Sequence, residues 1–518
     1  MMVTWPPPWS WPRADPQQTG RGAMIHAYTG SAVRAAEKPL LEAGQGEELM
    51  RRAAWGLAAV VLRELRARGP VAGSTVAALV GTGNNGGDAL WALSFLRRRG
   101  VDAVAVPMGE RMHEVGRIAL LRAGGRVAER VPPRTTLLID GVLGTGARGG
   151  WDPPAIPEGL AVVACDLPSG VDADTGHVAR GVIPADVTVT FGALKTGLLV
   201  GAGAHAAGRV ELVDIGLGPY LGEPDVSSLQ AEEALAVFGP PVWNAHKYSR
   251  GVLGVCAGSE QYPGAAVLVC AAAVASGLGM VQFAGPAAVR DHVLSSLPEV
   301  VVGEGTQGKA RAWVAGPGLG SGEDAGKRLS EVVDTCVEGS LPLVLDASAL
   351  DLVTLGDLKR LRSAGCPVVV TPHQGELVRL TERLVKPSAA PGSAVAPAPF
   401  EEVARKDPVA AARFAARSLD ALVLLKGPTT VCASSDGAVF VQNEGGPELA
   451  TAGSGDCLAG LVGSAVARVR RPEVTHELRR VAAASWLHGE AGKRAVVSGP
   501  FGASSLIGAV RKTLALGP

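Results

Sequence analysis

A carboxylate that follows a glycine loop and opens an apolar helix is the first feature of this sequence that could do chemistry. Gly453, Ser454 and Gly455 precede Asp456, and the Ala-rich stretch behind them has the character of a buried helix. Backbone N–H groups at such a helix start form an anion site, which the helix dipole strengthens. A carboxylate beside it suits removal of a hydroxyl proton during phosphoryl transfer, although Asp456 could instead only cap the helix.

Two more strand ends in this half of the chain carry groups that suit a nucleotide. Lys426 follows an apolar run, and Thr429 and Thr430 follow it closely. An ammonium group and hydroxyls at such a place bind phosphates. His373 in "TPHQGE" also ends an apolar run. A lone His is more often structural, but this position favours a role in a site.

In the other half, the loop "GTGNNGGD" (81–88) fits the G-x-G-x-x-G pattern of dinucleotide binding. The carboxylates of Asp88 and Asp140 would repel a bare pyrophosphate, and the second strand does not end in the acid that such a site uses. Amide, hydroxyl and carboxylate oxygens instead suit a hard cation. Taken alone, Asp88 could cap the next helix and Asp140 could form a turn.

Polar side chains end three different strands in this half. Asn85, Asp140, Asp166 and Ser169 therefore converge on one edge of a parallel sheet, because ligands bind beyond the carboxyl ends of its strands. Asp166, in "DLPSG", is hard to explain by structure alone. Lys195, in "GALKTG", could contact phosphate, but we expect a solvated surface lysine.

Apolar runs alternate with helical stretches in both halves, which predicts βαβ units and a parallel sheet in each. A helix is expected over 31–69, with a break near Pro39 and Gly44. Strands are expected at 75–80, 101–107, 135–140, 160–166, 186–191 and 209–216, and then at 251–258, 310–318, 341–347, 366–372, 421–427 and 429–434. The halves show no internal repeat and are predicted to be two different α/β domains.

Charge and composition narrow the class of function. The formal net charge of the 518 residues is +0, from 49 basic and 49 acidic side chains, so we expect no nucleic-acid partner. Seven Cys residues without C-x-x-C spacing suit reduced thiols and a cytoplasmic protein. The uncharged stretch 261–289 is long enough to cross a bilayer, but its Pro and Gly favour a buried helix followed by a core strand. We therefore expect no membrane partner.

The motifs "GTGNNGGD", "DGVLGTG" and "DLPSG", in this order, resemble the YjeF N-terminal domain, the NAD(P)H-hydrate epimerase. The resemblance covers roughly residues 25–215 and implies that Asn85, Asp140 and Ser169 hold a potassium ion. Ala89 stands where the family often has Gly. Epimerisation needs a group that shuttles a proton, and Asp166 is our candidate. The residues expected to hold the damaged nucleotide are Asn84, Asn85, Gly86, Gly87, Asp88, Gly144, Thr145, Gly146, Ala147, Arg148, Gly149, Gly150 and Asp166.

The motifs "HKYSRG", "GPGLG", "LVLDASAL", "TPHQGE", "KGPTT" and "AGSGD" resemble the ADP-dependent NAD(P)H-hydrate dehydratase, a domain of ribokinase-like fold, over roughly 230–518. The resemblance implies ADP with Mg²⁺ as phosphoryl donor, and ATP stays open. Asp456 is the expected catalytic base, and Ser348 stands where the family has an acid. Contacts to the hydrated nucleotide are expected from Ala265, Gly318, His373 and Asp456. Contacts to ADP are expected from Lys426, Gly427, Pro428, Thr429, Thr430 and Gly455.

These resemblances predict an α/β protein with an N-terminal Rossmann-like and a C-terminal ribokinase-like three-layer sandwich. The expected boundaries are a disordered tail (1–24), an epimerase domain (25–216), a linker (217–240) and a dehydratase domain (241–518). We expect a homo-oligomer that acts on the hydrates of NADH and NADPH and on ADP. One alternative is a vitamin or sugar kinase fused to a nucleotide-binding domain. The other is a regulatory protein that binds nucleotides without turnover, which the intact Asp166 and Asp456 disfavour.

Overall fold

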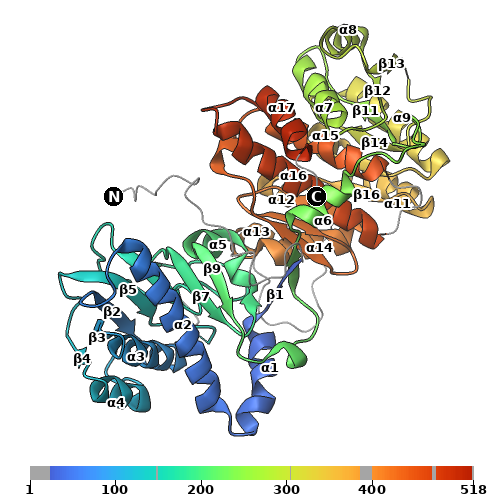
Figure 1. The fold of residues 1–518 in the computed structure, drawn as a ribbon. Helices are drawn as coiled ribbons and strands as arrows, with labels where there is room; N and C mark the ends of the chain where they lie inside the picture. Colours follow the sequence, from blue (N-terminus) through green and yellow to red (C-terminus); the bar gives the residue numbers. More distant parts are fainter. Residues whose placement is uncertain (1–23, 147–149, 304, 386–398, 469–473, 516–518) are drawn as a thin grey trace, which may run out of the picture. The chain divides into compact units, whose positions relative to one another are not determined.

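The computed structural model describes residues 24–146, 150–303, 305–385, 399–468 and 474–515, with side chains from 477 onward in the last range. These residues form two compact α/β units, which divide at residue 226 (Figure 1). The segment 217–240, for which the sequence predicts a linker, contains β10 (Val226–Ser228) and α6 (Ala231–Val237). Helix α6 packs on α16 (Val474–Val496) and is thus part of the second unit.

The first unit contains a seven-stranded sheet in which all neighbouring strands are parallel, in the order β4-β3-β2-β5-β6-β7-β9. Two of its inner strands, Thr75–Val80 and Ala161–Cys165, are almost continuous apolar runs, as is typical of parallel strands covered on both faces. The strands are β2 (Thr75–Val80), β3 (Asp102–Pro107), β4 (Arg126–Val127), β5 (Thr135–Gly141), β6 (Ala161–Cys165), β7 (Val187–Phe191) and β9 (Arg209–Val213). Outside this sheet, β1 (Ile25–Tyr28) pairs with β8 (Leu194–Lys195).

Helices α2 (Gly46–Arg68), α3 (Asn84–Arg97) and α4 (Glu114–Arg122) cover one face of this sheet. The other face is covered by loop side chains that include Met108, Val131, Trp151 and Ile156. The expected helix over 31–69 is two helices, α1 (Gly30–Glu42) and α2. The chain breaks at Gly44, whose φ of 77° is left-handed, and Pro39 lies inside α1.

The order of this sheet reverses beside β2, because β3 lies on one side of it and β5 on the other. Ligands of open α/β sheets bind in the crevice that forms at such a point, beyond the carboxyl ends of the strands. Two glycines make the turn there compact. A Cβ on Gly81 would lie 1.9 Å from the carbonyl oxygen of Val142, and one on Gly86 would lie 2.1 Å from that of Gly81.

The strands of the second unit lie in the order β13-β12-β11-β14-β15-β16-β17-β18-β19-β10. The pairs from β13 to β17 are parallel, and β17, β18 and β19 are antiparallel. The bounds are β11 (Val252–Cys256), β12 (Met280–Ala284), β13 (Val301–Gly303), β14 (Ala312–Ala315), β15 (Leu343–Leu345), β16 (Val368–Val370), β17 (Leu422–Leu425), β18 (Thr430–Ala433) and β19 (Val439–Gln442). Here the order reverses between β11 and β14.

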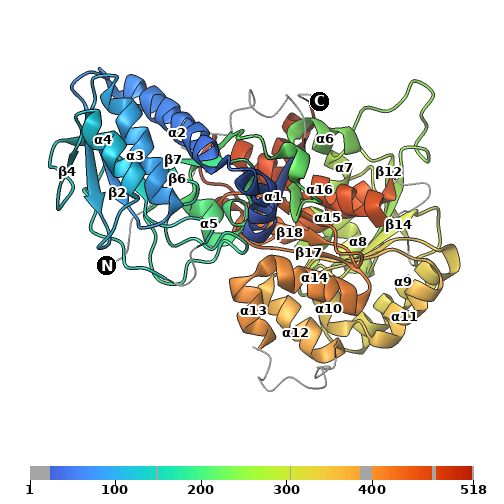
Figure 2. The same cartoon turned by 90° about the horizontal axis from the view of Figure 1, so that it is seen from below.

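Two helical layers enclose this second sheet (Figure 2). One layer holds α6, α7 (Pro263–Ala275), α8 (Ala287–Ser296), α15 (Ser454–Ala467), α16 and α17 (Ala503–Leu514). The other holds α9 (Glu323–Gly339), α10 (Ser348–Leu352), α11 (Leu355–Ser363), α12 (Gln374–Leu384), α13 (Phe400–Lys406) and α14 (Pro408–Leu419). The predicted α/β class is confirmed, and this unit is a three-layer sandwich.

The uncharged stretch 261–289 contains α7 followed by strand β12, as predicted. Both are largely buried in the core of the second unit. Among the described residues, none of the helices has the length and apolar character that crossing a bilayer would take.

Candidate active sites

A hydrogen-bonded cluster joins three of the predicted polar residues at the carboxyl ends of β5 and β6. The carboxylate of Asp140 accepts hydrogen bonds from Ser169 Oγ at 2.6 Å and from the Ser169 backbone N at 2.7 Å. Asn85 Nδ2 donates to the carbonyl oxygens of Leu143 at 2.8 Å and Cys165 at 2.6 Å. The structure therefore brings Asn85, Asp140 and Ser169 together from α3 and two strand ends.

The chemistry of this cluster fits a monovalent cation. Asn85 Oδ1 accepts no hydrogen bond from the described residues. This oxygen lies close to Gly144, since a Cβ on that glycine would be only 2.7 Å from it. The cluster supplies amide, hydroxyl and carboxylate oxygens from Asn85, Ser169 and Asp140, and hard cations prefer such ligands. Burial raises the pKa of Asp140 to about 6, and a nearby cation would favour its ionised form.

The segment "NNGGD" is the first part of α3 rather than a free loop. Helix α3 begins at Asn84 with Gly83 as its N-cap residue, and no side chain caps it. The interpretation of Asp88 as a helix cap is therefore wrong, because Asp88 lies inside the helix and is buried. The backbone N–H groups of the first turn remain available for an anion.

Asp166 and Lys195 form a buried ion pair at the ends of β6 and β8. Lys195 Nζ lies 2.5 Å from Asp166 Oδ1 and also donates to Thr190 Oγ1 and to the Phe191 carbonyl oxygen, each at 3.0 Å. Lys195 is only 1% exposed, so the expectation of a solvated surface lysine is wrong. Asp166 itself has a left-handed φ of 68°, which is uncommon for a residue with a side chain.

Two more carboxylates face this ion pair. Burial raises the pKa of Asp88 well above its usual range, and the negative charges of Asp166 and Glu37 raise it further. Burial also raises the pKa of Glu37, which lies on α1. No sequence pattern points to Glu37, because only the fold brings α1 to this edge of the sheet.

The second predicted loop of this site is partly described. The Thr145 carbonyl oxygen accepts a hydrogen bond from Arg34 Nη1 at 2.8 Å, and a Cβ on Gly146 would meet nothing within 4 Å. A Cβ on Gly150 would lie 2.5 Å from Arg180. Ala147, Arg148 and Gly149, which were predicted to bind the nucleotide, lie outside the described residues.

In the second unit, Asp456 lies in the first turn of α15, directly after the glycine loop. Gly453 is the N-cap residue, with a left-handed φ of 86°, and no side chain caps the helix. Asp456 is thus not a cap. Burial and the charge of Asp346 raise its pKa to about 6, while Lys426 lowers it. A carboxylate with that pKa is ionised near neutral pH and can accept a proton.

Lys426 follows β17 directly and lies among three carboxylates, which are Asp346 after β15, Glu376 in α12 and Asp456 in α15. Its Nζ is 2.8 Å from Asp346 Oδ1 and 3.7 Å from Glu376 Oε2. Burial alone would lower the pKa of Lys426, but Asp346, Glu376 and Asp456 outweigh burial and raise it. Its side chain stays 21% exposed, so the ammonium group remains open to a ligand. Asp346 directly follows β15, which is a sequence signal, whereas Glu376 lies in α12 and is brought to Lys426 by the fold.

His373 caps α12. Its Nδ1 accepts from the Glu376 backbone N at 3.2 Å, and Glu376 accepts from the His373 backbone N at 2.8 Å. The His373 side chain is 55% exposed and pairs with Glu376 at 3.5 Å through Nε2. Since the His373 backbone also bridges to Lys426, the histidine stands beside the lysine and serves both as cap and as exposed polar group.

The remaining predicted substrate contacts lie where the sheet order reverses. A Cβ on Gly318, whose φ is 62°, would lie 2.6 Å from the Ala265 Cβ, so α7 and the loop after β14 touch. Beside them a hollow of about 230 Å³ is lined by Gln261, Tyr262, Gly320, Ser321, Ser348, Asp351 and Leu352. Ser348, the departure from the family pattern, therefore lines an open space next to this contact.

The predicted ADP contacts form the turn between β17 and β18. Gly427 and Pro428 are exposed, Thr429 is buried, and Thr430 begins β18. A Cβ on Gly455 would lie 3.8 Å from Lys426 Nζ, so the turn and the start of α15 adjoin.

His488 on α16 is a site residue that the sequence analysis missed. Its Nε2 lies 3.1 Å from Ser454 Oγ and 3.0 Å from the Ser454 carbonyl oxygen, at the first residue of α15. Burial lowers its pKa to about 4, so the ring is neutral near pH 7. Nothing in the spacing links residue 488 to residue 454, because only the packing of α16 on α15 brings them together.

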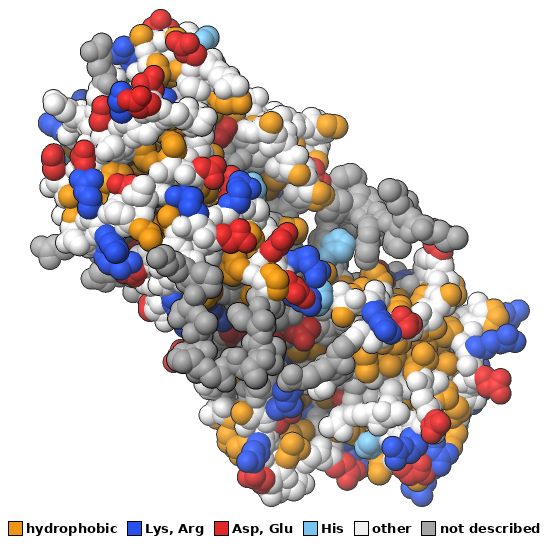
Figure 3. All heavy atoms as spheres, turned by 180° about the vertical axis from the view of Figure 1, so that it is seen from behind, with side chains coloured by type: hydrophobic (Ala, Val, Ile, Leu, Met, Phe, Trp, Pro, Cys, Tyr) orange, Lys and Arg blue, Asp and Glu red, His pale blue; other side chains and the backbone are white. Residues whose placement is uncertain are grey.

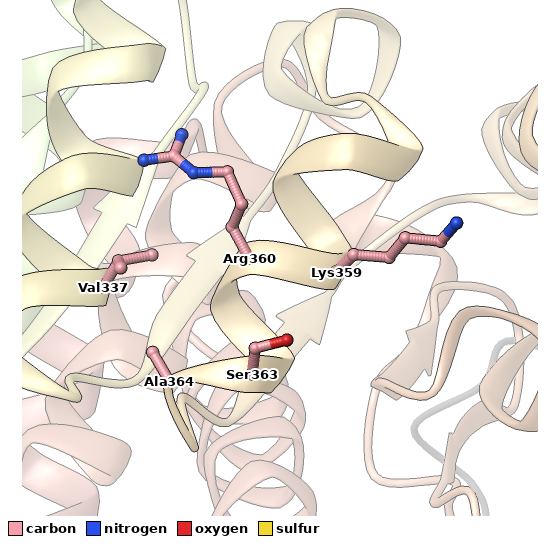
Figure 4. A pocket seen from close by; sticks show the side chains of 5 residues that line it. All are labelled: Val337, Lys359, Arg360, Ser363 and Ala364. Atoms are coloured by element: carbon pink, nitrogen blue, oxygen red, sulfur yellow. The ribbon is translucent and has the colours of Figure 1, made fainter.

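A larger hollow of about 430 Å³ lies between α9 and α11 and carries none of the predicted site residues. In Figure 4, the Arg360 side chain of α11 extends toward α9, and the Lys359 side chain points away from it. Arg360 is held by Asp334 at 2.5 Å.

On the face shown in Figure 3, basic and acidic side chains are interspersed, so recognition must depend on the local groups at the strand ends.

Comparison with known proteins gives matches to both units. A family described as YjeF-related protein N-terminus matches residues 46–197, and the NAD(P)H-hydrate dehydratase family matches 253–503. A bifunctional NAD(P)H-hydrate repair enzyme of Mycobacterium tuberculosis is 43% identical over 459 residues, covering 86% of this chain and 89% of the relative. The Mycobacterium leprae enzyme of the same description is 42% identical with the same coverage.

Among solved structures, the ADP/ATP-dependent NAD(P)H-hydrate dehydratase of Bacillus subtilis, co-crystallised with ATP/Mg²⁺, is 25% identical. It covers 55% of this chain and 97% of its own, with a TM-score of 0.46.

Proposed function

The chain belongs to the family of bifunctional NAD(P)H-hydrate repair enzymes, and from this we propose how its two units act. The first unit interconverts the R and S epimers of hydrated NADH and NADPH. The second unit dehydrates the S epimer and so returns NADH or NADPH. The observation that carries the second assignment is the half-buried carboxylate of Asp456 at the start of α15, near the lysine of the β17–β18 turn.

The hydrate carries a hydroxyl group on C6 of the nicotinamide ring, and hydroxide is a poor leaving group. Asp456 removes the hydroxyl proton as the oxygen bonds to the terminal phosphorus of the donor, and the bond from that phosphorus to its bridging oxygen breaks, so that the nucleotide leaves one phosphate shorter. The N1 lone pair then expels phosphate as the C6–O bond breaks, a proton passes from C5 to solvent, and the C5–C6 double bond forms. The backbone amides of α15 and the ammonium group of Lys426 support the charge of the transferring phosphoryl group.

The phosphoryl donor is ADP, which enters as its Mg²⁺ complex. Support comes from the turn that joins Lys426 to Thr430 and from its closeness to Gly455. Within the described residues no three His, Cys, Asp or Glu side chains are grouped to hold a metal, and Mg²⁺ commonly binds through substrate phosphates instead.

In the first unit, Asn85, Asp140 and Ser169 would hold K⁺ next to the ends of β5 and β6. When bound, the ion would supply fixed positive charge that orients polar groups of the substrate. Asn84 to Asp88 and the loop after β5 would bind the nucleotide through backbone N–H groups of the α3 start. Asp166 moves the proton that epimerisation requires.

We assign the protein to the cytoplasm as a homo-oligomer. Support for a reducing compartment is that all seven Cys residues are free and buried. Support for self-association is the exposed indole of Trp55 on α2, which packs edge-on against Phe95 and remains 54% exposed. Sedimentation of the purified chain would test the second point.

The experiment that tests the dehydratase assignment supplies S-NADH hydrate with ADP and follows the near-ultraviolet absorbance of regenerated NADH. Asp456→Asn should abolish the recovery, because the amide cannot accept the hydroxyl proton. Full activity in this variant would refute the base role. Accumulation of a stable phosphorylated product by the unchanged chain would instead support a small-molecule kinase.

A further inference from the structure

Asp88 is a buried carboxylate that the fold leaves without a hydrogen-bond donor. The side chain is 7% exposed, and among the described residues no group donates a hydrogen bond to it. An unpaired buried carboxyl group favours its neutral form, since the charged form is costly to desolvate. A neutral carboxyl group carries a proton that it can donate.

Asp166 is in the opposite situation. Lys195 uses its three N–H groups on Asp166 Oδ1, Thr190 Oγ1 and the Phe191 carbonyl oxygen, so it has none left for a substrate. The hydrogen bonds to Asp166 all end on Oδ1, and Oδ2 accepts none from the described residues. Lys195 therefore fixes one oxygen of an ionised carboxylate and leaves the other available.

We propose that Asp88 is the proton donor and Asp166 the proton acceptor of the epimerisation, and that Lys195 is a positioning residue that holds Oδ1 of Asp166 and leaves Oδ2 to accept the proton. This inference rests on the proposed function of the first unit. Two carboxylates in environments that differ in this way can serve as acid and base at one pH.

The step conserves atoms and electrons. Asp88 gives its proton to the C6 hydroxyl oxygen, the C6–O bond breaks, and water leaves while the N1 lone pair forms an N1–C6 double bond. Water then adds to the other face of C6, N1 regains its lone pair, and the released proton goes to Asp166. The ring is neither oxidised nor reduced. The proton returns to Asp88 through solvent, or when the opposite epimer reacts.

Groups from several elements face Asp88: Glu37 on α1, Asp166 and Cys165 at the end of β6, and Lys195 in β8. His113, the N-cap residue of α4, lies against the adjoining Gly87. Burial and the two carboxylates raise the pKa of Asp88 well above its usual range, so its proton is kept to higher pH than in an ordinary aspartate and is lost as pH rises through the raised pKa. The epimerisation rate should therefore fall on the alkaline side.

The test starts from pure S-NADH hydrate without ADP, so that only the first unit acts, and separates the two epimers by chromatography over time. Asp88→Asn should lower kcat by about 10²- to 10³-fold with little change in KM, and should remove the alkaline limb of the pH profile. Asp88→Glu should restore part of the rate. Glu211→Gln is the matched control, because it removes a buried carboxylate of the same unit that only pairs with Arg63 and Arg209.

Lys195→Met tests the positioning role. Without the ammonium group, Asp166 Oδ1 loses its charged hydrogen-bond partner and the carboxylate is no longer held in place, so kcat of the epimerisation should fall with little change in KM. A purely structural lysine would lower the amount of folded enzyme without changing the kcat of the folded fraction. Thermal unfolding of each variant establishes that the first unit is folded.

An Asp88→Asn variant with an unchanged rate and pH profile would overturn the inference while the proposed function stands. A wild-type chain that interconverts no epimers would overturn the proposed function of the first unit itself. Loss of rate in both Asp88→Asn and Asp88→Glu with an unmoved pH profile would also count against the donor role.

Discussion

Both units set a lysine beside an aspartate at the carboxyl ends of parallel strands, but they use the pair differently. In the first unit, Lys195 is buried, and its ammonium group donates hydrogen bonds to Asp166, Thr190 and Phe191. In the second unit, Lys426 forms an ion pair with Asp346. Its charge lowers the pKa of the reacting carboxylate of Asp456 only through a longer-range electrostatic interaction.

The difference follows from what each site must hold. A lysine that has to meet a phosphate needs an exposed end and a raised pKa, and Lys426 has both. A lysine that only has to hold a carboxylate in place can be closed off from solvent, as Lys195 is. The same two residue types thus give a ligand-binding cation in one unit and a fixed internal charge in the other.

The largest expected effect separates the two lysines. Lys426→Met should lower kcat/KM for ADP in the dehydration by about 10²- to 10³-fold, because one preorganised cation at the transferring phosphoryl group is lost. Lys195→Met should leave that rate unchanged when S-NADH hydrate is supplied. If both variants lowered the dehydration rate equally, the two lysines would not have the different roles assigned to them here.

The pH dependence of the dehydration rate should report the ionisation of Asp456, the reacting carboxylate of the second unit. Asp456 must be ionised to act as a base, so the rate should fall about tenfold per pH unit below its pKa of about 6. Asp346→Asn removes a charge that raises this pKa, and the fall should move to lower pH. Asp334→Asn, on the exposed surface of α9, is the control and should leave the profile in place.

A smaller effect is expected where α7 meets the loop after β14. Gly318→Ala places a Cβ 2.6 Å from the Ala265 Cβ at a left-handed φ, and should destabilise the chain by about 1–3 kcal/mol. Gly326→Ala in α9, where a Cβ meets nothing within 4 Å, should instead stabilise by about 0.5–1 kcal/mol. Denaturant titrations of the two variants measure the contrast.

The smallest effect concerns the support of the α15 start. His488→Leu removes the hydrogen-bond partner of Ser454 Oγ and should cost about 1 kcal/mol of stability, with a modest rise in KM for ADP. The first unit should keep its epimerisation rate. A change in that rate would mean that the two sites do not behave independently.

Much of this arrangement could be predicted from the sequence, because the residues at the ends of apolar strands converge whenever the strands are parallel. This reasoning points to Asn85, Asp140, Ser169 and Lys426, whereas Asp456 is indicated by the glycine loop that opens its helix. Lys195 was misjudged because a two-residue strand carries no periodic signal, and its burial depends on Asp166, 29 residues away. Glu37 and His488 lie on helices, where only tertiary packing determines which functional group they meet.

The start of α3 teaches a related lesson. The two Asn and two Gly residues looked like a loop, since each of them disfavours helix interiors. Tertiary packing overrides that preference. Gly86 packs so close to the Gly81 carbonyl oxygen that no residue with a side chain would fit. The helix therefore begins four residues before Asp88, and the carboxylate is carried into the interior.

Alkylation of the seven buried Cys thiols can measure, in each variant, whether the folded chain has opened locally. Burial raises the pKa of most of them, including Cys256 and Cys457 to about 12, and only the thiolate attacks alkylating reagents. Native protein should therefore label slowly, and labelling should speed up only when the chain opens. Because Cys165 lies beneath the first site and Cys457 adjoins Asp456, mass spectrometry of the modified peptides would report which unit a substitution has loosened.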